Sequence, residues 1–137
     1  MGNATASFKA WAEAMTESEI ADVATRWMQL QALPQDSSEA KQLMRAAIQV
    51  NMMTIQQPEE CWKVVMKIFG ETTDEWILTN LGAGPIESLL SRHPDMMLPM
   101  VEREAKTNKR FKDVLNNVWQ NQMSDEVWQR LQAVRSE

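Results

Sequence analysis

The stretch that decides the fold runs from Leu81 to Leu90, LGAGPIESLL, and holds two of the four glycines. A phosphate-binding loop would follow a strand and carry a Lys with a Ser or Thr at fixed spacing, and this stretch has no Lys. Gly82 instead suits the left-handed end of a helix. Gly84 and Pro85 suit the N-cap and first position of a second helix, with Glu87 reaching back to the cap. We therefore predict a tight corner between two helices, and an anion site at the second helix start is the alternative.

Helical periodicity continues on both sides of this stretch. Apolar residues recur at spacings of three and four in every long segment, and none alternates as a strand does. Capping boxes at 16–19 and 72–75, with a similarly spaced pair at 36–39, mark helix starts. We predict a single all-α domain over 1–137, a compact irregular helical bundle or short helical array of seven to eight helices. Its N-terminal helices occupy 1–55.

The helix that ends near Gln56 is rich in methionine and carries two apolar stripes. Leu43, Ala47 and Val50 form the first, and Met44, Ile48, Met52 and Ile55 form the second. Because a helix that is apolar on more than one face belongs inside a protein, we expect this helix to be central. The same Met-rich helix is where a homodimer would form, and the sequence leaves that alternative open.

Tryptophan is unusually frequent, with six residues against no tyrosine. Trp27, Trp62, Trp119 and Trp128 fall in apolar stripes and are predicted to pack in the core. Trp11 and Trp76 are less firmly placed by the pattern. An exposed Trp surrounded by acidic residues would be a typical anchor for a protein partner.

The charge balance excludes several classes of partner. Fourteen basic and nineteen acidic residues give a net charge of −5, which disfavours nucleic acid, and no basic stripe with interleaved aromatics offsets it. The nearest basic cluster, at 106–112, is interpreted as a solvated helix start. No apolar run approaches the ~18 residues that a membrane span requires, and the first residues lack a secretory layout. We therefore predict a cytoplasmic protein with no membrane partner.

The sequence offers little material for catalysis. His93 is the only histidine and Cys61 the only cysteine, so a zinc site is disfavoured and Cys61 is expected to be a small core residue. We predict no catalytic residue, no metal and no cofactor, and hence not an enzyme. A less favoured alternative is a small enzyme that uses Glu87 and His93 near the predicted corner.

Several motifs in the second half of the chain resemble a known family. They are Trp62, LGAGPIESLLSRHPD at 81–95, Phe111 with VLNNVW at 114–119, and SDEVWQRLQAVR at 124–135. Together they resemble an uncharacterised family of small bacterial proteins with a Gly-Pro-Leu/Ile-Glu-x-Leu-Leu core and a Trp-rich C-terminal end. The resemblance covers about residues 59–135 and implies a bacterial source. It implies no activity, because that family is a domain of unknown function.

These features favour an acidic protein-binding module. In its most concrete form it is an immunity or antitoxin protein that binds and neutralises a basic toxin or effector, helped by electrostatic steering. The predicted partner-binding residues are Glu59, Glu60, Asp74, Glu75, Trp76, Glu87 and His93. The alternative is a structural or regulatory subunit that forms homo-oligomers.

Overall fold

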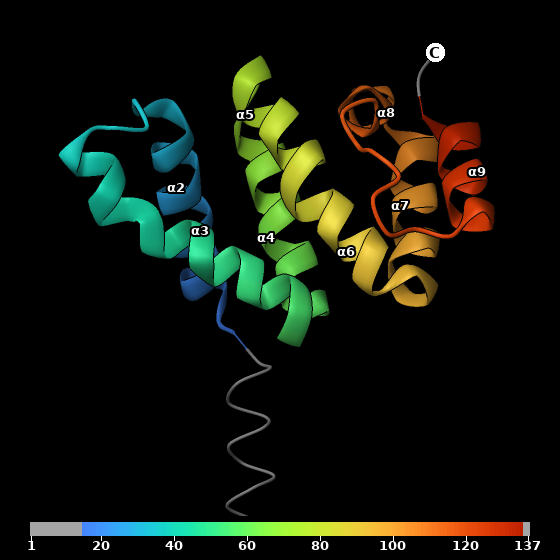
Figure 1. Cartoon of the computed structure of the whole chain (residues 1–137), viewed down its shortest axis with the longest axis horizontal. Coiled ribbons are helices and arrows are strands. Elements are labelled where there is room, and N and C mark those ends of the chain that lie inside the picture. Colours follow the sequence, from blue (N-terminus) through green and yellow to red (C-terminus); the bar gives the residue numbers. More distant parts are fainter. Residues whose placement is uncertain (1–14, 136–137) are drawn as a thin grey trace, which may run out of the picture. The chain divides into compact units, whose positions relative to one another are not determined.

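The fold is all-α, as the periodicity predicts. The computed structural model describes residues 15–135, and this part contains eight α-helices, one π-helical segment and no strand. None of these helices combines the length and the apolar content needed to cross a membrane. The elements, shown in Figure 1, are α2 (Glu17–Ala32), α3 (Ser38–Gln56), α4 (Pro58–Glu71), α5 (Glu75–Leu81), η1 (Gly82–Ile86), α6 (Glu87–Arg92), α7 (Pro94–Thr107), α8 (Lys109–Leu115) and α9 (Asp125–Val134).

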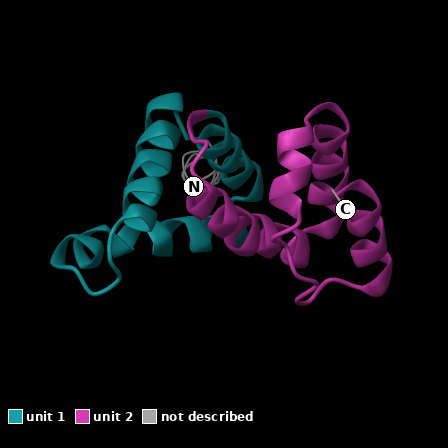
Figure 2. Cartoon of the chain, turned by 90° about the horizontal axis from the view of Figure 1, so that it is seen from above, with its two compact units in different colours: residues 1–70 teal, residues 71–137 magenta. Residues whose placement is uncertain are grey.

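The chain divides into two compact units. Unit 1 comprises residues 1–70 and unit 2 residues 71–137, coloured teal and magenta in Figure 2. The boundary falls at the last residue of α4. Unit 1 therefore contains α2, α3 and nearly all of α4, and unit 2 contains the remaining helices.

In unit 1, α2 begins with the predicted capping box. Thr16 Oγ1 accepts the Glu19 N–H at 3.1 Å, and Glu19 Oε1 accepts the Thr16 N–H at 3.0 Å. Hydrogen bonding of the Glu19 carboxylate to the Thr16 backbone, and secondarily to the Thr16 side chain, lowers the pKa of Glu19. The helix then packs against α3. Trp27 lies on the buried face of α2 and is only 4% exposed, so its predicted place in the core is confirmed.

Only one side of α3 is covered, and the expectation of a central helix is wrong. Its cap is Ser37, whose Oγ accepts the Ala40 N–H at 3.1 Å, so the cap predicted from the 36–39 pair is wrong by one residue. Its buried face contains Ala46, Val50 and Met53. The second predicted stripe faces outward, with exposed fractions of 45% for Met44, 58% for Ile48, and 42% for both Met52 and Ile55. Periodicity shows which residues share a face of a helix. Which face is covered depends on neighbours distant in sequence.

Cys61 is a core residue of α4, as predicted. Its side chain is fully buried, Sγ lies 4.0 Å from the Val50 carbonyl oxygen, and burial raises the pKa of the thiol to about 12. Because alkylation needs an accessible thiolate, iodoacetamide at pH 8 should label native Cys61 roughly a hundredfold or more slowly than Cys61 in the urea-unfolded chain. Mass spectrometry of timed samples measures both rates. Equal rates would show that the thiol is not buried.

In unit 2, α5, η1 and α6 form one uninterrupted helical rod, so the predicted corner is wrong. Gly82 has right-handed helical angles, φ −68° and ψ −49°, and no glycine in the described part has a positive φ. The Glu87 N–H donates to the Gly82 carbonyl five residues back, the pattern of a π-helix. Since the rod does not start again at Gly84, the helix-start anion site considered for this stretch is not formed.

Gly82 is required by a close contact between helices rather than by its backbone conformation. A Cβ at this position would lie 2.5 Å from the Val114 carbonyl oxygen and 3.0 Å from Asn117 Cβ. The end of α8 can therefore approach the rod only because position 82 has no side chain. A Cβ at Gly84 would have no neighbour within 4 Å.

The core of unit 2 forms around α7, which contacts α6, α8 and α9. Its largest fully buried side chains include Leu90, Met97, Phe111 and Leu131. The predicted burial of Trp119 is wrong, because its side chain is 74% exposed. The helix expected to carry it ends at Leu115, so a 3.6-residue period no longer applies at position 119.

The remaining two predicted core tryptophans are partly buried. Trp62 in unit 1 and Trp128 in unit 2 each lie between the buried and exposed classes. The Arg135 guanidinium lies 5.1 Å from the centroid of the Trp128 ring, within the range of a cation–π contact.

Candidate protein-binding site

An exposed tryptophan stands at the start of α5. Trp76 is 59% exposed. The helix is capped by Asp74, whose Oδ1 accepts the N–H groups of Trp76 at 2.9 Å and Ile77 at 3.1 Å. Thr72, the cap expected from spacing, instead accepts the Asp74 N–H at 3.1 Å through Oγ1. We call residues 71–76 the Trp76 corner.

The Trp76 corner is strongly acidic. Glu71, Asp74 and Glu75 are all exposed. The Asp74 carboxylate is held in place by the two N–H groups that it caps. Glu75 lies in the first turn of α5, where a negative charge is favourable beside the positive end of the helix. On the α8 side, Arg110 Nη2 donates to the Thr72 carbonyl at 3.4 Å. Three exposed carboxylates therefore lie within the five residues that precede an exposed tryptophan.

An open pocket of about 330 Å³ adjoins the corner. One wall comes from the corner and α5, and the other from α8 and the residues that follow it. Its lining residues are Thr73, Glu75, Leu78, Thr79, Arg110, Asp113, Val114 and Asn117. The close approach at Gly82 sets the spacing of these two walls, because it brings Val114 and Asn117 against the rod.

A second exposed tryptophan lies on the loop between α8 and α9. We call residues 116–124 the Trp119 loop. Glu87, in the rod, holds it: Oε1 accepts the Trp119 N–H at 2.7 Å and Oε2 accepts the Asn121 Nδ2 at 3.1 Å. Asn121 has φ 48°, a left-handed angle that Asn tolerates better than most residues. Val118 and Met123, 2% and 5% exposed, fix the loop to the core.

The Trp119 loop differs from the Trp76 corner in charge. It contains five Asn and Gln residues and no Asp, Glu, Lys or Arg. The segments that carry the two exposed tryptophans of unit 2 therefore differ in charge: the Trp76 corner is acidic, whereas the Trp119 loop has no charged residue of its own and is held by the carboxylate of Glu87.

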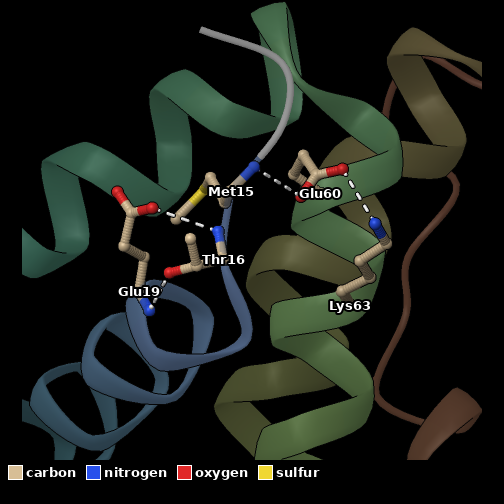
Figure 3. Close-up of polar contacts among 5 residues, drawn as sticks. All are labelled: Met15, Thr16, Glu19, Glu60 and Lys63. Atoms are coloured by element: carbon tan, nitrogen blue, oxygen red, sulfur yellow. Dashed lines mark hydrogen bonds and ion pairs between the residues drawn. The ribbon is translucent and has the colours of Figure 1, made fainter. Parts of the chain in front are cut away.

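The two predicted site residues of unit 1 have separate roles. Glu59 is exposed in the first turn of α4. Glu60 is only 6% exposed: Oε2 accepts the Met15 N–H at 3.2 Å, and Oε1 accepts Lys63 Nζ at 3.0 Å (Figure 3). Glu60 thus ties Met15, which directly precedes the N-cap of α2, to α4, and this is a structural role.

The other five predicted residues lie in unit 2, and three of them come together. Asp74, Glu75 and Trp76 form the Trp76 corner. Glu87 belongs to the Trp119 loop contact, and the His93 N–H donates to the Leu89 carbonyl where α6 ends and α7 begins. Arg110 and Asn117, which line the pocket, were not predicted, because they lie 35 and 42 positions after Glu75 and so give no local signal of their place beside it.

The described residues offer no arrangement for metal chemistry. Across 15–135, no three His, Cys, Asp or Glu side chains are grouped closely enough to hold a metal ion. Both oxygens of Glu87, the acid or base of the alternative enzyme, accept hydrogen bonds from the Trp119 loop. The Trp76 corner thus presents an aromatic ring and negative charge beside an open pocket, which suits binding.

Comparison with known proteins assigns the chain to a family but to no known function. The chain belongs to DUF6869, a family of unknown function, whose model matches residues 33–137. The expected membership of an uncharacterised family is confirmed, and the match begins before residue 59, so that it includes α3. No curated protein and no solved structure matches the chain significantly.

Proposed function

We propose that this protein is a binding module whose Trp76 corner docks a basic partner protein. The observation that carries the proposal is a tryptophan 59% exposed among the exposed carboxylates of Glu71, Asp74 and Glu75. Tryptophan is enriched among residues that dominate binding energy. The acidic side chains around it would steer a positively charged surface and accelerate its association.

The pocket beside the corner gives the partner a place to insert a side chain. Leu78 and Val114 supply apolar surface. Glu75 and Asp113 supply two negative charges against the single positive charge of Arg110, so the lining has a negative balance. An Arg or Lys of the partner, with an aliphatic stem and a cationic end, fits such a lining. In its concrete form the protein is a cytoplasmic immunity or antitoxin protein that covers the active site of a basic toxin or effector.

A pull-down from an extract of the native host tests the proposal. Tagged protein at low salt should retain a basic protein, and high salt should release it because the attraction between exposed charges is screened. If that partner is an enzyme, adding the purified chain should inhibit it. A partner that is acidic, or that stays bound equally well in high salt, would contradict the proposal.

The Trp76→Ala variant should weaken binding of the captured partner about thirtyfold, corresponding to ~2 kcal/mol for a central anchor. Trp119→Ala is the matched control, because it removes an exposed indole of the same unit (74% against 59% for Trp76) from a loop without charged residues. This variant should change affinity less than about twofold. Titration calorimetry measures both. Equal losses in the two variants, or no loss in Trp76→Ala, would remove the corner from the interface.

A further inference from the structure

The outward face of α3 has no role in the site described above. Met44, Ile48, Met52 and Ile55, which we call the α3 stripe, are 42–58% exposed and follow one another at spacings of four, four and three residues. These spacings place all four on one side of the helix. The opposite side of α3 is buried within the protein, so the stripe is a second apolar face available for contact.

We infer that the α3 stripe binds the same stripe of a second copy of this chain, with the two α3 helices antiparallel. The stripe is self-complementary about a two-fold axis near residue 50. Such an axis places Met44 opposite Ile55 of the second copy and Ile48 opposite Met52 of the second copy. Every apolar side chain therefore meets an apolar side chain, as an isologous interface requires.

The charges at the ends of the helix select the antiparallel arrangement. Lys41 and Arg45 are exposed at the N-terminal end of the stripe. The last turn of α3 contains no basic residue, and the exposed Glu59 follows shortly after it. Antiparallel pairing brings the cations of one copy to the negative C-terminal end of the other helix. Parallel pairing would instead place Lys41 and Arg45 against the same residues of the second copy.

The size of the stripe indicates a weak, reversible dimer. One pair of helix faces buries less than the roughly 800 Å² per partner of a standard interface. We therefore expect a dissociation constant on the order of 10 μM. The dimer uses α3 of unit 1 and is independent of the Trp76 corner, so either proposal can fail without the other.

Sedimentation equilibrium of the full chain tests for the dimer. The wild-type protein should shift from monomer to dimer as its concentration rises through the micromolar range, and Ile48→Glu should weaken the dimer at least tenfold with an unchanged circular dichroism spectrum. Met96→Glu is the matched control, because it alters an apolar side chain that is 39% exposed on α7, and its dimer should equal the wild-type dimer. An Ile48→Glu dimer as tight as wild-type would overturn the proposal.

Disulfide trapping tests the direction of the two helices. Chains carrying Met44→Cys or Ile55→Cys, oxidised separately, should stay mostly uncrosslinked, whereas an equal mixture should form the heterodisulfide between positions 44 and 55. Native Cys61 is buried and should not contribute. Crosslinks within each separate variant would indicate parallel helices and overturn the arrangement. A protein that stays monomeric at ten times the expected dissociation constant, and binds lipid vesicles unless Ile48 is changed to Glu, would assign the stripe to a membrane surface instead.

Discussion

Gly82→Ala should lower the free energy of unfolding by about 2 kcal/mol, although alanine is the better helix former. The new Cβ would lie 2.5 Å from the backbone oxygen of Val114, and a backbone atom cannot move aside as a flexible side chain can. Overpacking of this kind costs about 1–3 kcal/mol, and the clash with a backbone atom places this site toward the upper end. The gain in helix propensity, about 1 kcal/mol, offsets part of it.

Gly84→Ala is the control for this prediction. Gly84 lies two residues away in the same π-helical segment, and its new Cβ would have no neighbour within 4 Å. That variant should gain about 0.5 kcal/mol, because alanine restricts the unfolded chain. Urea unfolding followed by circular dichroism measures both values. Destabilisation of equal size in the two variants would mean that the segment, rather than the contact with α8, is sensitive to substitution.

Glu87→Ala should release the Trp119 loop and cost about 1–2 kcal/mol of stability. The change removes the acceptor of the Trp119 N–H and of the Asn121 side chain, and hydrogen bonds to a charged acceptor contribute about 1.5–3 kcal/mol when protected from water. The lower figure is expected because Trp119 and Asn121 are exposed. Hydrogen exchange of the Trp119 amide should accelerate by at least tenfold, consistent with a loss of ~1.4 kcal/mol or more.

Glu87→Gln separates geometry from charge in the same contact. A glutamine keeps an oxygen that can accept the Trp119 N–H, and the Asn121 amide can turn to accept from its NH₂ group. In Glu87→Gln, hydrogen exchange of the Trp119 amide should therefore proceed at a rate between those of the wild-type and Glu87→Ala proteins. An unchanged rate in Glu87→Ala would show that Val118 and Met123 alone hold the loop in place.

Local rules explain what the sequence could predict. Thr16, Asn108 and Ser124 each cap a helix through the third residue that follows, and this depends only on neighbours within one turn. The same spacing failed at Thr72, because Asp74 competes for the free N–H groups and binds two of them. Two plausible caps two residues apart cannot be ranked by spacing alone.

Contacts between distant segments explain what could not be predicted. Glu87 and Trp119 are 32 positions apart, and the need for glycine at position 82 arises from α8. In isolation, Gly, Gly and Pro within four residues favour a break in the helix. For the site, the acidic surroundings of Trp76 were visible in the sequence, whereas the pocket beside it depends on α8.

The π-helical segment gives the rod two helical phases. A turn closed by a bond five residues back takes in about one residue more than an α-turn, which at 100° per residue offsets α6 from α5 by more than a quarter of a revolution. One continuous rod can thus present Leu78 and Gly82 to α8 and a different side of α6 to α7. The number of residues between 82 and 86, more than their identity, sets the angle between the Trp76 ring and the apolar side of α6. A one-residue deletion there would rotate that ring about the rod axis without altering a single residue of the Trp76 corner.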